Sequence, residues 1–339
     1  MAQNLVGIDV GRDNVKICCR DHGTRFIVRR LPENIMGKDG LVSPRVMVEF
    51  LKRLRAEEHI HTRDASIVLT EKSTFFRHVT LPAMTVSELK VNLPFEFHDF
   101  ISENPDGYVF DYAVDEMVLN DAGEPERMEL FAAATRKDSL QRYEEALRRA
   151  GFRVKVAVPA PMATMFLFRN GHEGEARPTG DGSVVIDIGY KNMVISLYDG
   201  DRYRGSRRVE SGCYDVDLAI AELKGVDPHV AGSYRDKDFD EVLESRECMA
   251  VFERLLFEVS KVVNFYTFSH PETTINNIYL AGGGACIDAL VSLIASDFDT
   301  PVWLVNSLMS DDARTSREAV VCSLAYAGLI AGEANLNGD

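Results

Sequence analysis

The chain has 339 residues, more than one usual domain length, and this favours two domains. Hydrophobic residues make up 45% and charged residues 27%, the composition of an ordinary globular protein. The formal net charge of −15 argues against nucleic acid or an anionic membrane surface as the main partner, because both require a basic surface. The six cysteines have no C-x-x-C spacing, which indicates reduced thiols in a cytoplasmic protein.

The first predicted elements are three strands, one helix and a fourth strand. Apolar runs and polar turns place strands at 5–10, 15–19, 25–29 and 65–69, and a helix at 46–57. The helix is expected to begin near Ser43-Pro44, since proline favours the first helical turn. This order is the opening of a ribonuclease-H-like domain.

The stretch 75–158 is expected to be an inserted module with the order β-α-β-β-α-β. Its first helix begins with a capping box of Thr85 and Glu88, and Pro94 is expected to kink it. Its other elements are strands at 77–81, 108–118, 129–134 and 153–158, and a helix at 137–150 that ends at Gly151.

The opening pattern returns after a polar, Gly- and Pro-rich linker at 171–182. The predicted elements are strands at 183–188, 193–198, 202–209, 277–280 and 302–305, and helical segments at 214–268, 287–295 and 316–330. We therefore expect one domain at 1–168, to which a closing helix within 313–331 returns, and a second at 181–312. The apolar stretch 319–330 is too short to span a bilayer, so membrane association is expected only through a partner.

Two copies of an Asp-apolar-Gly motif lie half a chain apart, each at the end of a predicted buried strand. Asp9 and Asp187 are suited to hold Mg²⁺, which prefers one or two carboxylates together with phosphate oxygens. The glycines that follow, Gly11 and Gly189, allow backbone N–H groups to approach a phosphate. A single motif of this kind is often only a turn, whereas two facing copies favour a nucleotide site.

A third glycine-rich turn, Gly282 to Gly284, lies between a predicted strand and a predicted helix. Such a turn lets the backbone approach a phosphate or a flat ring, although a plain strand-to-helix turn is the alternative. It lacks both the Lys-Ser/Thr of a phosphate-binding P-loop and the spacing of a dinucleotide fingerprint.

Together the three turns resemble the phosphate-1, phosphate-2 and adenosine motifs of the actin-like ATPase superfamily. From Leu5 to about Ile330 the chain is similar to its PilM/FtsA branch, whose distinctive insert falls where the module at 75–158 stands. The resemblance implies an α/β actin-like ATPase fold, with two ribonuclease-H-like domains around a cleft that binds ATP and Mg²⁺. The nucleotide-binding residues it implies are Asp9, Gly11, Arg12, Asn14, Lys16, Asp187, Gly189, Lys191, Asn192, Gly212, Glu258, Lys261, Gly282, Gly283 and Gly284. For Glu258 and Lys261 a solvated ion pair is the alternative.

The sequence departs from the family pattern at both hairpins. Arg12-Asp13-Asn14 and Tyr190-Lys191 replace small residues, and Asp13 would repel phosphate if it faced inward. Lys191 could compensate as a phosphate contact. The interdomain stretch 158–163 also lacks the acidic or amide side chain that orients water in brisk ATPases. We therefore expect nucleotide binding with slow or absent hydrolysis.

The resemblance further implies a cytoplasmic scaffold of a type IV pilus or related secretion assembly. Its expected partner is the cytoplasmic N-terminal segment of a PilN-like inner-membrane protein, which would recruit it to the inner face of the membrane. The residues expected to line that groove, or alternatively to form the insert's own core, are Leu89, Leu93, Phe95 and Phe97.

Two other functions are alternatives to the scaffold. A small-molecule kinase of the superfamily needs an aspartate base beside the acceptor hydroxyl, and no further Asp stands out in a Gly-rich strand end. An FtsA-like polymerising protein would typically end in an amphipathic tail, where this chain has a short acidic one at 331–339. Oligomerisation is compatible with either the scaffold or the polymerising protein.

Overall fold

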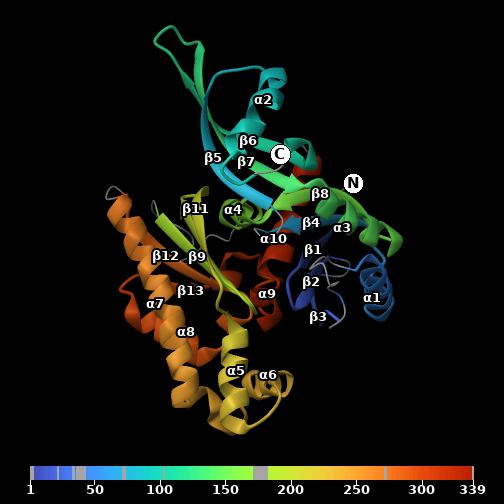
Figure 1. Cartoon of the computed structure of the whole chain (residues 1–339), viewed down its shortest axis with the longest axis vertical. Helices are drawn as coiled ribbons and strands as arrows, with labels where there is room; N and C mark the ends of the chain where they lie inside the picture. The colour runs from blue at the N-terminus through green and yellow to red at the C-terminus, as the bar shows by residue number, and fades with distance from the viewer. Residues whose placement is uncertain are drawn as a thin grey trace. The chain divides into compact units, whose positions relative to one another are not determined.

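The computed structural model describes residues 4–20, 23–32, 35, 43–70, 74–101, 104–170, 182–270 and 273–337 (Figure 1). The chain separates into two compact units. The first comprises Met1–Asp9, Leu31–Ala163 and Gly328–Asp339, and the second Val10–Arg30 and Thr164–Ala327. The predicted domain boundaries at 168 and 181 stay predictions, and the predicted linker lies outside the described residues except for Gly182.

The first five-stranded sheet has the strand order β3-β2-β1-β4-β8. Its central strands β1, β4 and β8 are parallel, while β2 and β3 form an antiparallel hairpin. Its elements and the associated helix are β1 (Val6–Val10), β2 (Asn14–Cys19), β3 (Arg25–Arg30), α1 (Pro44–Glu57), β4 (Asp64–Leu69) and β8 (Arg153–Pro159). The predicted bounds of these elements agree with the observed ones to within about two residues. The central strands were recognisable because uninterrupted apolar runs are typical of strands covered on both faces.

The second five-stranded sheet repeats this topology in the order β11-β10-β9-β12-β13. Its strands are β9 (Gly182–Ile188), β10 (Met193–Asp199), β11 (Arg202–Val209), β12 (Ile275–Ala281) and β13 (Val302–Leu304). Both sheets place the first strand of the repeat in the centre, with a two-stranded hairpin on one side and two parallel strands on the other. The internal repeat predicted from the two Asp-apolar-Gly motifs is therefore confirmed.

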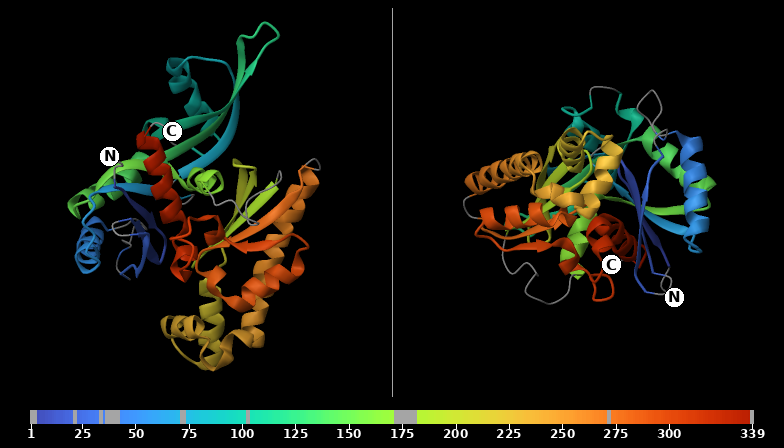
Figure 2. Two further views of the ribbon diagram at one scale, coloured as in Figure 1. Left: turned by 180° about the vertical axis from the view of Figure 1, so that it is seen from behind. Right: turned by 90° about the horizontal axis from the view of Figure 1, so that it is seen from below.

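The helices of the second unit follow its hairpin. They are α5 (Cys213–Lys224), α6 (Pro228–Lys237), η4 (Phe239–Glu244), α7 (Arg246–Ser269), η5 (Gly284–Cys286) and α8 (Asp288–Asp297). Helices α7 and α8 lie side by side (Figure 2), and the Ser260 hydroxyl on α7 donates to Asp297 Oδ2 on α8 at 3.0 Å. The single helical region predicted between 214 and 268 is therefore three helices, divided by turns.

The predicted closing helix is two helices, α9 (Arg317–Val321) and α10 (Ser323–Asn337), divided at Cys322. Within the first unit, α10 packs directly on β4. A Cβ on Gly328 would lie 2.5 Å from Val68 Cγ2, and one on Gly332 would lie 2.7 Å from Ser66 Cβ. The two glycines, one helical turn apart, let the helix backbone approach the sheet more closely than side chains would allow.

The inserted module contains a separate three-stranded sheet of order β5-β7-β6. Its elements, with the helix that follows, are β5 (Thr74–Pro82), α2 (Val86–Asn92), η2 (Leu93–Phe97), η3 (Pro105–Gly107), β6 (Tyr108–Leu119), β7 (Pro125–Arg136) and α3 (Lys137–Arg149). The capping box is confirmed: Thr85 N donates to Glu88 Oε2 at 2.7 Å, and Glu88 N donates to Thr85 Oγ1 at 3.3 Å. The helix passes into a 3₁₀ turn at Leu93, just before Pro94.

One expectation about the module needs correction. The order β-α-β-β-α-β is present, but its last strand, β8, pairs with β4 of the first five-stranded sheet and is not part of the insert's sheet. The module is therefore not a closed unit of six elements.

Helix α4 (Ala160–Asn170) follows β8 directly. In the described part of the chain, no helix is both long and apolar enough to cross a membrane.

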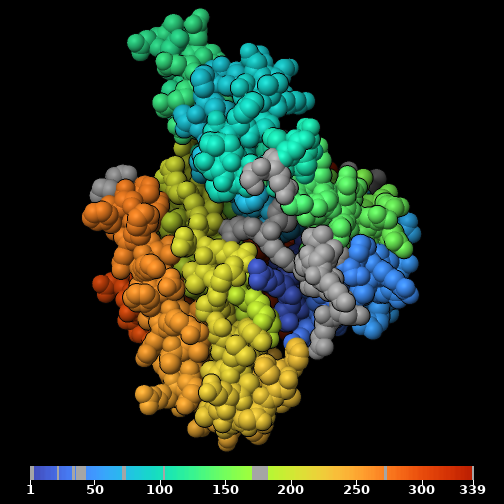
Figure 3. All heavy atoms as spheres, viewed as in Figure 1, coloured from blue at the N-terminus to red at the C-terminus, as the bar shows by residue number. Residues whose placement is uncertain are grey.

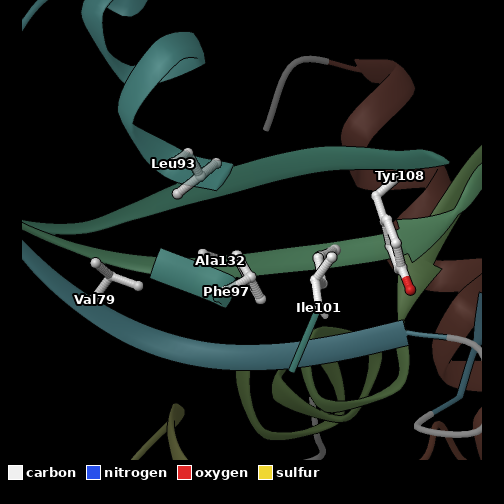
Figure 4. Close-up of a cluster of buried hydrophobic side chains, with 7 residues drawn as sticks. Val79, Leu93, Phe97, Ile101, Tyr108 and Ala132 are labelled. Carbon is white, nitrogen blue, oxygen red and sulfur yellow. The ribbon is translucent and has the colours of Figure 1, made fainter. Parts of the chain in front are cut away.

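Three of the four expected partner-binding residues belong to the core of the insert. Leu93 and Phe97 pack with Val79 and Tyr108 (Figure 4), and Leu89 packs with neighbouring apolar residues of β7. All three are at most 3% exposed, so they cannot line a surface groove, and the alternative of an internal core is correct. Only Phe95, which is 68% exposed, faces solvent.

Candidate functional site

The two Asp-apolar-Gly hairpins close in the same way. Gly11 N donates to Asn14 O at 2.9 Å, and Gly189 N donates to Asn192 O at 3.0 Å. Both are therefore hairpins with a two-residue loop at the end of a buried strand, which is the geometry that the repeat predicts. The expected contacts Asn14 and Asn192 thus contribute their carbonyl groups to the hairpins, and the amides of both glycines are engaged within them.

The second hairpin is held against the start of α5. Cys213 N donates to Gly189 O at 3.0 Å, and Tyr214 N donates to Tyr190 O at 2.8 Å. Gly212 permits this approach, because a Cβ there would lie 2.5 Å from the Gly189 carbonyl oxygen. Two of the unpaired amides at the start of a helix are thereby satisfied by the hairpin and do not point at a ligand.

The glycine turn after β12 lies against the end of β9. Gly282 has a φ of +81°, and a Cβ there would collide with Asp187 Oδ1 and lie 2.6 Å from the Ile188 carbonyl oxygen. A Cβ on Gly284 would lie 2.6 Å from the Ile188 Cβ atom and collide with its methyl group. Gly189, Gly212, Gly282 and Gly284 thus form a glycine cradle around the Asp187 strand end. The chain itself fills the Cβ positions of these four glycines, whereas Gly283 is exposed and has only Cys213 Sγ, at 3.8 Å, near its Cβ position. The Gly283 backbone is therefore the part of the turn that a phosphate or nucleoside could approach.

Lys191 does not extend freely from the tip of the second hairpin. Its Nζ atom lies 2.8 Å from the centroid of the Tyr214 ring, and the Tyr190 and Tyr214 rings lie 5.4 Å apart in an edge-to-face arrangement. Burial lowers the pKa of Lys191. The ammonium group is therefore held by a cation–π interaction, which supplies part of the stabilisation that water would otherwise give it.

A buried ion pair supports this hairpin from behind. Arg235 of α6 donates to Asp217 Oδ1 of α5 at 2.8 Å and to the Cys213 carbonyl oxygen at 3.2 Å. The Asp217 side chain is 2% exposed, and burial raises its pKa to about 6 even though Arg235 acts in the opposite direction. Burial, with Asp217 nearby, also raises the pKa of Tyr190. Sequence reasoning missed this pair, because each residue alone looks like a helix-surface charge.

The first hairpin is surrounded by ion pairs. Arg12 lies 3.7 Å from Glu210, and Asp13 lies 3.5 Å from Arg30 at the end of β3. Arg30 also contacts His229 near the start of α6. Asp13, the residue expected to repel phosphate, therefore faces a guanidinium group.

The remaining expected residues lie on other elements. Glu258 and Lys261 form an i,i+3 ion pair of 3.7 Å on α7, with side chains 31% and 62% exposed, as the alternative reading expects. Lys16 is partly buried in β2 opposite Val28. Asp9 is 2% exposed in the first unit, where burial and Asp9 raise the pKa of Tyr143.

The chemistry available at Asp9 and Asp187 suits one metal in particular. Among the residues that the structure describes, no group of three or more His, Cys, Asp and Glu side chains could enclose a metal ion. Mg²⁺ needs no such cage, since it is commonly held by one or two carboxylates and by the oxygens of a bound phosphate. A carboxylate at the end of a buried strand therefore has the chemistry that Mg²⁺ accepts when it arrives with a nucleotide.

Comparison with solved structures defines the class of protein. A chain of the "PilM-PilN type IV pilus biogenesis complex" aligns with a TM-score of 0.79 and 20% identity, covering 98% of this chain and 99% of the other. EutJ, an ethanolamine utilization protein from Carboxydothermus hydrogenoformans, aligns with a TM-score of 0.56 and 15% identity. The alignment covers 94% of this chain and 88% of the EutJ chain. MreB5 of Spiroplasma citri, bound to AMPPNP, aligns with a TM-score of 0.54 and 10% identity. The alignment covers 100% of this chain and 98% of the MreB5 chain.

These likenesses and the repeated sheets define an actin-like ATPase fold. The fold predicted from the sequence is therefore confirmed. The family profile of the type IV pilus assembly protein PilM matches residues 7–324, nearly the whole chain. The chain belongs to this family.

Proposed function

We propose that the protein is an ATP-binding scaffold of a type IV pilus or related secretion assembly. The observation that carries the nucleotide part is the exposed backbone of Gly283 beside the Asp187 strand end, where the glycine cradle lets the turn after β12 pack directly on β9. Asp187 and Asp9 would hold the Mg²⁺ ion, and Gly189 and Gly283 would lie beside the nucleotide. Bound Mg²⁺ would neutralise phosphate charge.

Hydrolysis is proposed to be slow or absent. The stretch from Val158 to Ala163, at the end of β8 and the start of α4, carries no acidic or amide side chain to orient a water molecule. Positioning of the attacking water is a large part of catalysis in nucleotide hydrolysis. The bound nucleotide would therefore act as a lasting structural ligand of the scaffold.

Calorimetric titration with Mg-ATP tests the nucleotide site. We expect the wild-type chain to bind, and Asp187→Asn and Asp9→Asn each to weaken binding by at least about tenfold, because a metal-holding carboxylate is lost. Asp201→Asn, in the exposed turn between β10 and β11, is the charge-matched control and should bind like wild type. A folded wild-type chain that binds no Mg-ATP would contradict the proposal, and rapid Asp187-dependent phosphate release would contradict slow hydrolysis.

The proposed partner is the cytoplasmic N-terminal segment of a PilN-like inner-membrane protein. Membership of the PilM family and the similarity to a chain of a PilM–PilN complex support it. Through this partner the protein would be held at the inner face of the cytoplasmic membrane. On the insert, Phe95 is an exposed aromatic residue next to a packed core, which is typical of a docking anchor.

Phe95→Ser tests the position of that surface. We expect the affinity for a PilN-like N-terminal peptide to fall about tenfold or more, since an aromatic anchor commonly contributes over 1.4 kcal/mol. Phe268→Ser is the matched control, because Phe268 is 86% exposed on α7, which lies at the surface (Figure 3). Equal affinities of the Phe95→Ser variant and wild type, measured by fluorescence anisotropy, would move the peptide site away from Phe95.

A further inference from the structure

The cations around the tip of the first hairpin are already matched by carboxylates of the same chain. Arg12 pairs with Glu210 at 3.7 Å, and Arg30 pairs with Asp13 at 3.5 Å. Glu210 also holds Arg208 at 2.7 Å. These groups come from separate parts of the chain: the first hairpin, β3, and the connection between β11 and α5. The first hairpin thus presents no unmatched positive charge to a ligand.

Lys191 at the second hairpin is held differently, because its Nζ atom lies over the Tyr214 ring. Burial lowers its pKa, while the nearby carboxylates of Asp13 and Asp215 act in the opposite direction. Asp13 is therefore the direct partner of Arg30 and lies near Lys191. Asp215 is fixed in turn, because its carboxylate accepts from Gly212 N at 3.2 Å and lies 3.6 Å from Arg254.

We propose that Asp13 and Glu210 act as resident anions that occupy the cations at the first hairpin and so limit the affinity of the site for polyphosphate. The proposal rests on the proposed nucleotide site, and it concerns what sets the strength of binding there. A triphosphate that approaches Arg12 or Arg30 must displace a carboxylate or lie beside it. Either event costs free energy, because like charges a few ångströms apart repel and ion pairs must be broken.

The resident ion pairs are suited to this role because they are accessible. The side chains of Arg12 and Glu210 are 38% and 64% exposed, and those of Arg30 and Asp13 are 47% and 21% exposed. Exposed ion pairs contribute little to folding stability, so their carboxylates can be exchanged for a ligand without unfolding the chain. The buried pair of Asp217 and Arg235 behind the second hairpin is not exchangeable in this way.

Neutral isosteres of the two carboxylates test the proposal. We expect Asp13→Asn to bind Mg-ATP about tenfold more tightly than wild type, and Glu210→Gln to bind it a few-fold more tightly, by calorimetry. The controls Asp121→Asn and Glu124→Gln remove the same charges from the exposed turn between β6 and β7 and should remain within about twofold of wild type. Thermal melting of each variant without nucleotide should stay close to that of wild type, since each lost pair has an exposed arginine or glutamate partner and Asp13 is half-buried at the surface.

The outcomes distinguish failure of the resident-anion proposal from failure of the proposed nucleotide site. If wild type binds Mg-ATP and both hairpin variants bind it no more tightly, the resident-anion proposal fails and the nucleotide site stands. If the control variants gain as much affinity as Asp13→Asn, the effect is one of net charge, and the proposal also fails. If wild type binds weakly while Asp13→Asn and Glu210→Gln bind more tightly and the controls do not, both proposals are supported. If no folded variant binds, both are wrong.

Discussion

Gly282→Ala should destabilise the protein by about 3 kcal/mol or more, measured as the free energy of unfolding in denaturant. Two costs add at this position. The backbone has a φ of +81°, a conformation that an alanine adopts only at a cost of about 1–2 kcal/mol. The new Cβ would also lie 2.6 Å from the Ile188 carbonyl oxygen and collide with Asp187 Oδ1, so the turn after β12 would have to move away from β9.

Gly225→Ala separates the two costs. Gly225 follows α5 with a φ of +63°, and nothing lies within 4 Å of the position of its Cβ. Only the backbone cost applies there, and we expect a loss of about 1 kcal/mol. If Gly282→Ala and Gly225→Ala lose equal stability, the close contact between the glycine turn and Asp187 is not real, and the glycine cradle loses its main support.

The close contact at Gly282 also explains what the sequence could and could not predict. The succession of strands along the chain and the hairpins followed from apolar runs, turn residues and the repeated Asp-apolar-Gly motif, since these local features carry that information. The contact of Gly282 with Asp187 was not predictable, because it joins residues far apart in the chain. A glycine run predicts only that some group approaches closely, and the fold decides which one.

The partner-binding residues illustrate a second limit. Leu89, Leu93 and Phe97 were expected either at a groove or in the core, and helical spacing alone does not distinguish the two. The sheet of the insert decides the matter, because these residues face Val79 and Leu130 on its strands. Similarly, the sequence shows that Asp13 departs from the family pattern at the first hairpin, but it does not show which cation pairs with it. Arg30 lies beside Asp13 because β2 pairs with β3.

The buried ion pair behind the second hairpin should make stability depend on pH once Arg235 is removed. Arg235→Met leaves the Asp217 carboxylate, 2% exposed, without its guanidinium, and we expect a loss of about 3 kcal/mol at pH 8. Burial already raises the pKa of Asp217 to about 6, above its ordinary value, and loss of Arg235 raises it further. An acid with a raised folded-state pKa contributes stability that is lost as pH rises through that pKa. The deficit of Arg235→Met relative to wild type should therefore be smaller at pH 5 than at pH 8.

Two comparisons make this result specific to the buried pair. The double variant Arg235→Met/Asp217→Asn removes the buried charge together with its partner and should recover most of the stability at pH 8, because a stranded carboxylate is the main cost. Arg254→Met, which breaks the exposed pair with Asp215, should change stability by less than about 1 kcal/mol at either pH. A deficit of Arg235→Met that is the same at pH 5 and pH 8, or a double variant no more stable than the single one, would mean that Arg235 supports the hairpin through packing alone. Recovery in the double variant would instead show that charge compensation at Asp217 keeps α5 and α6 joined behind Tyr190.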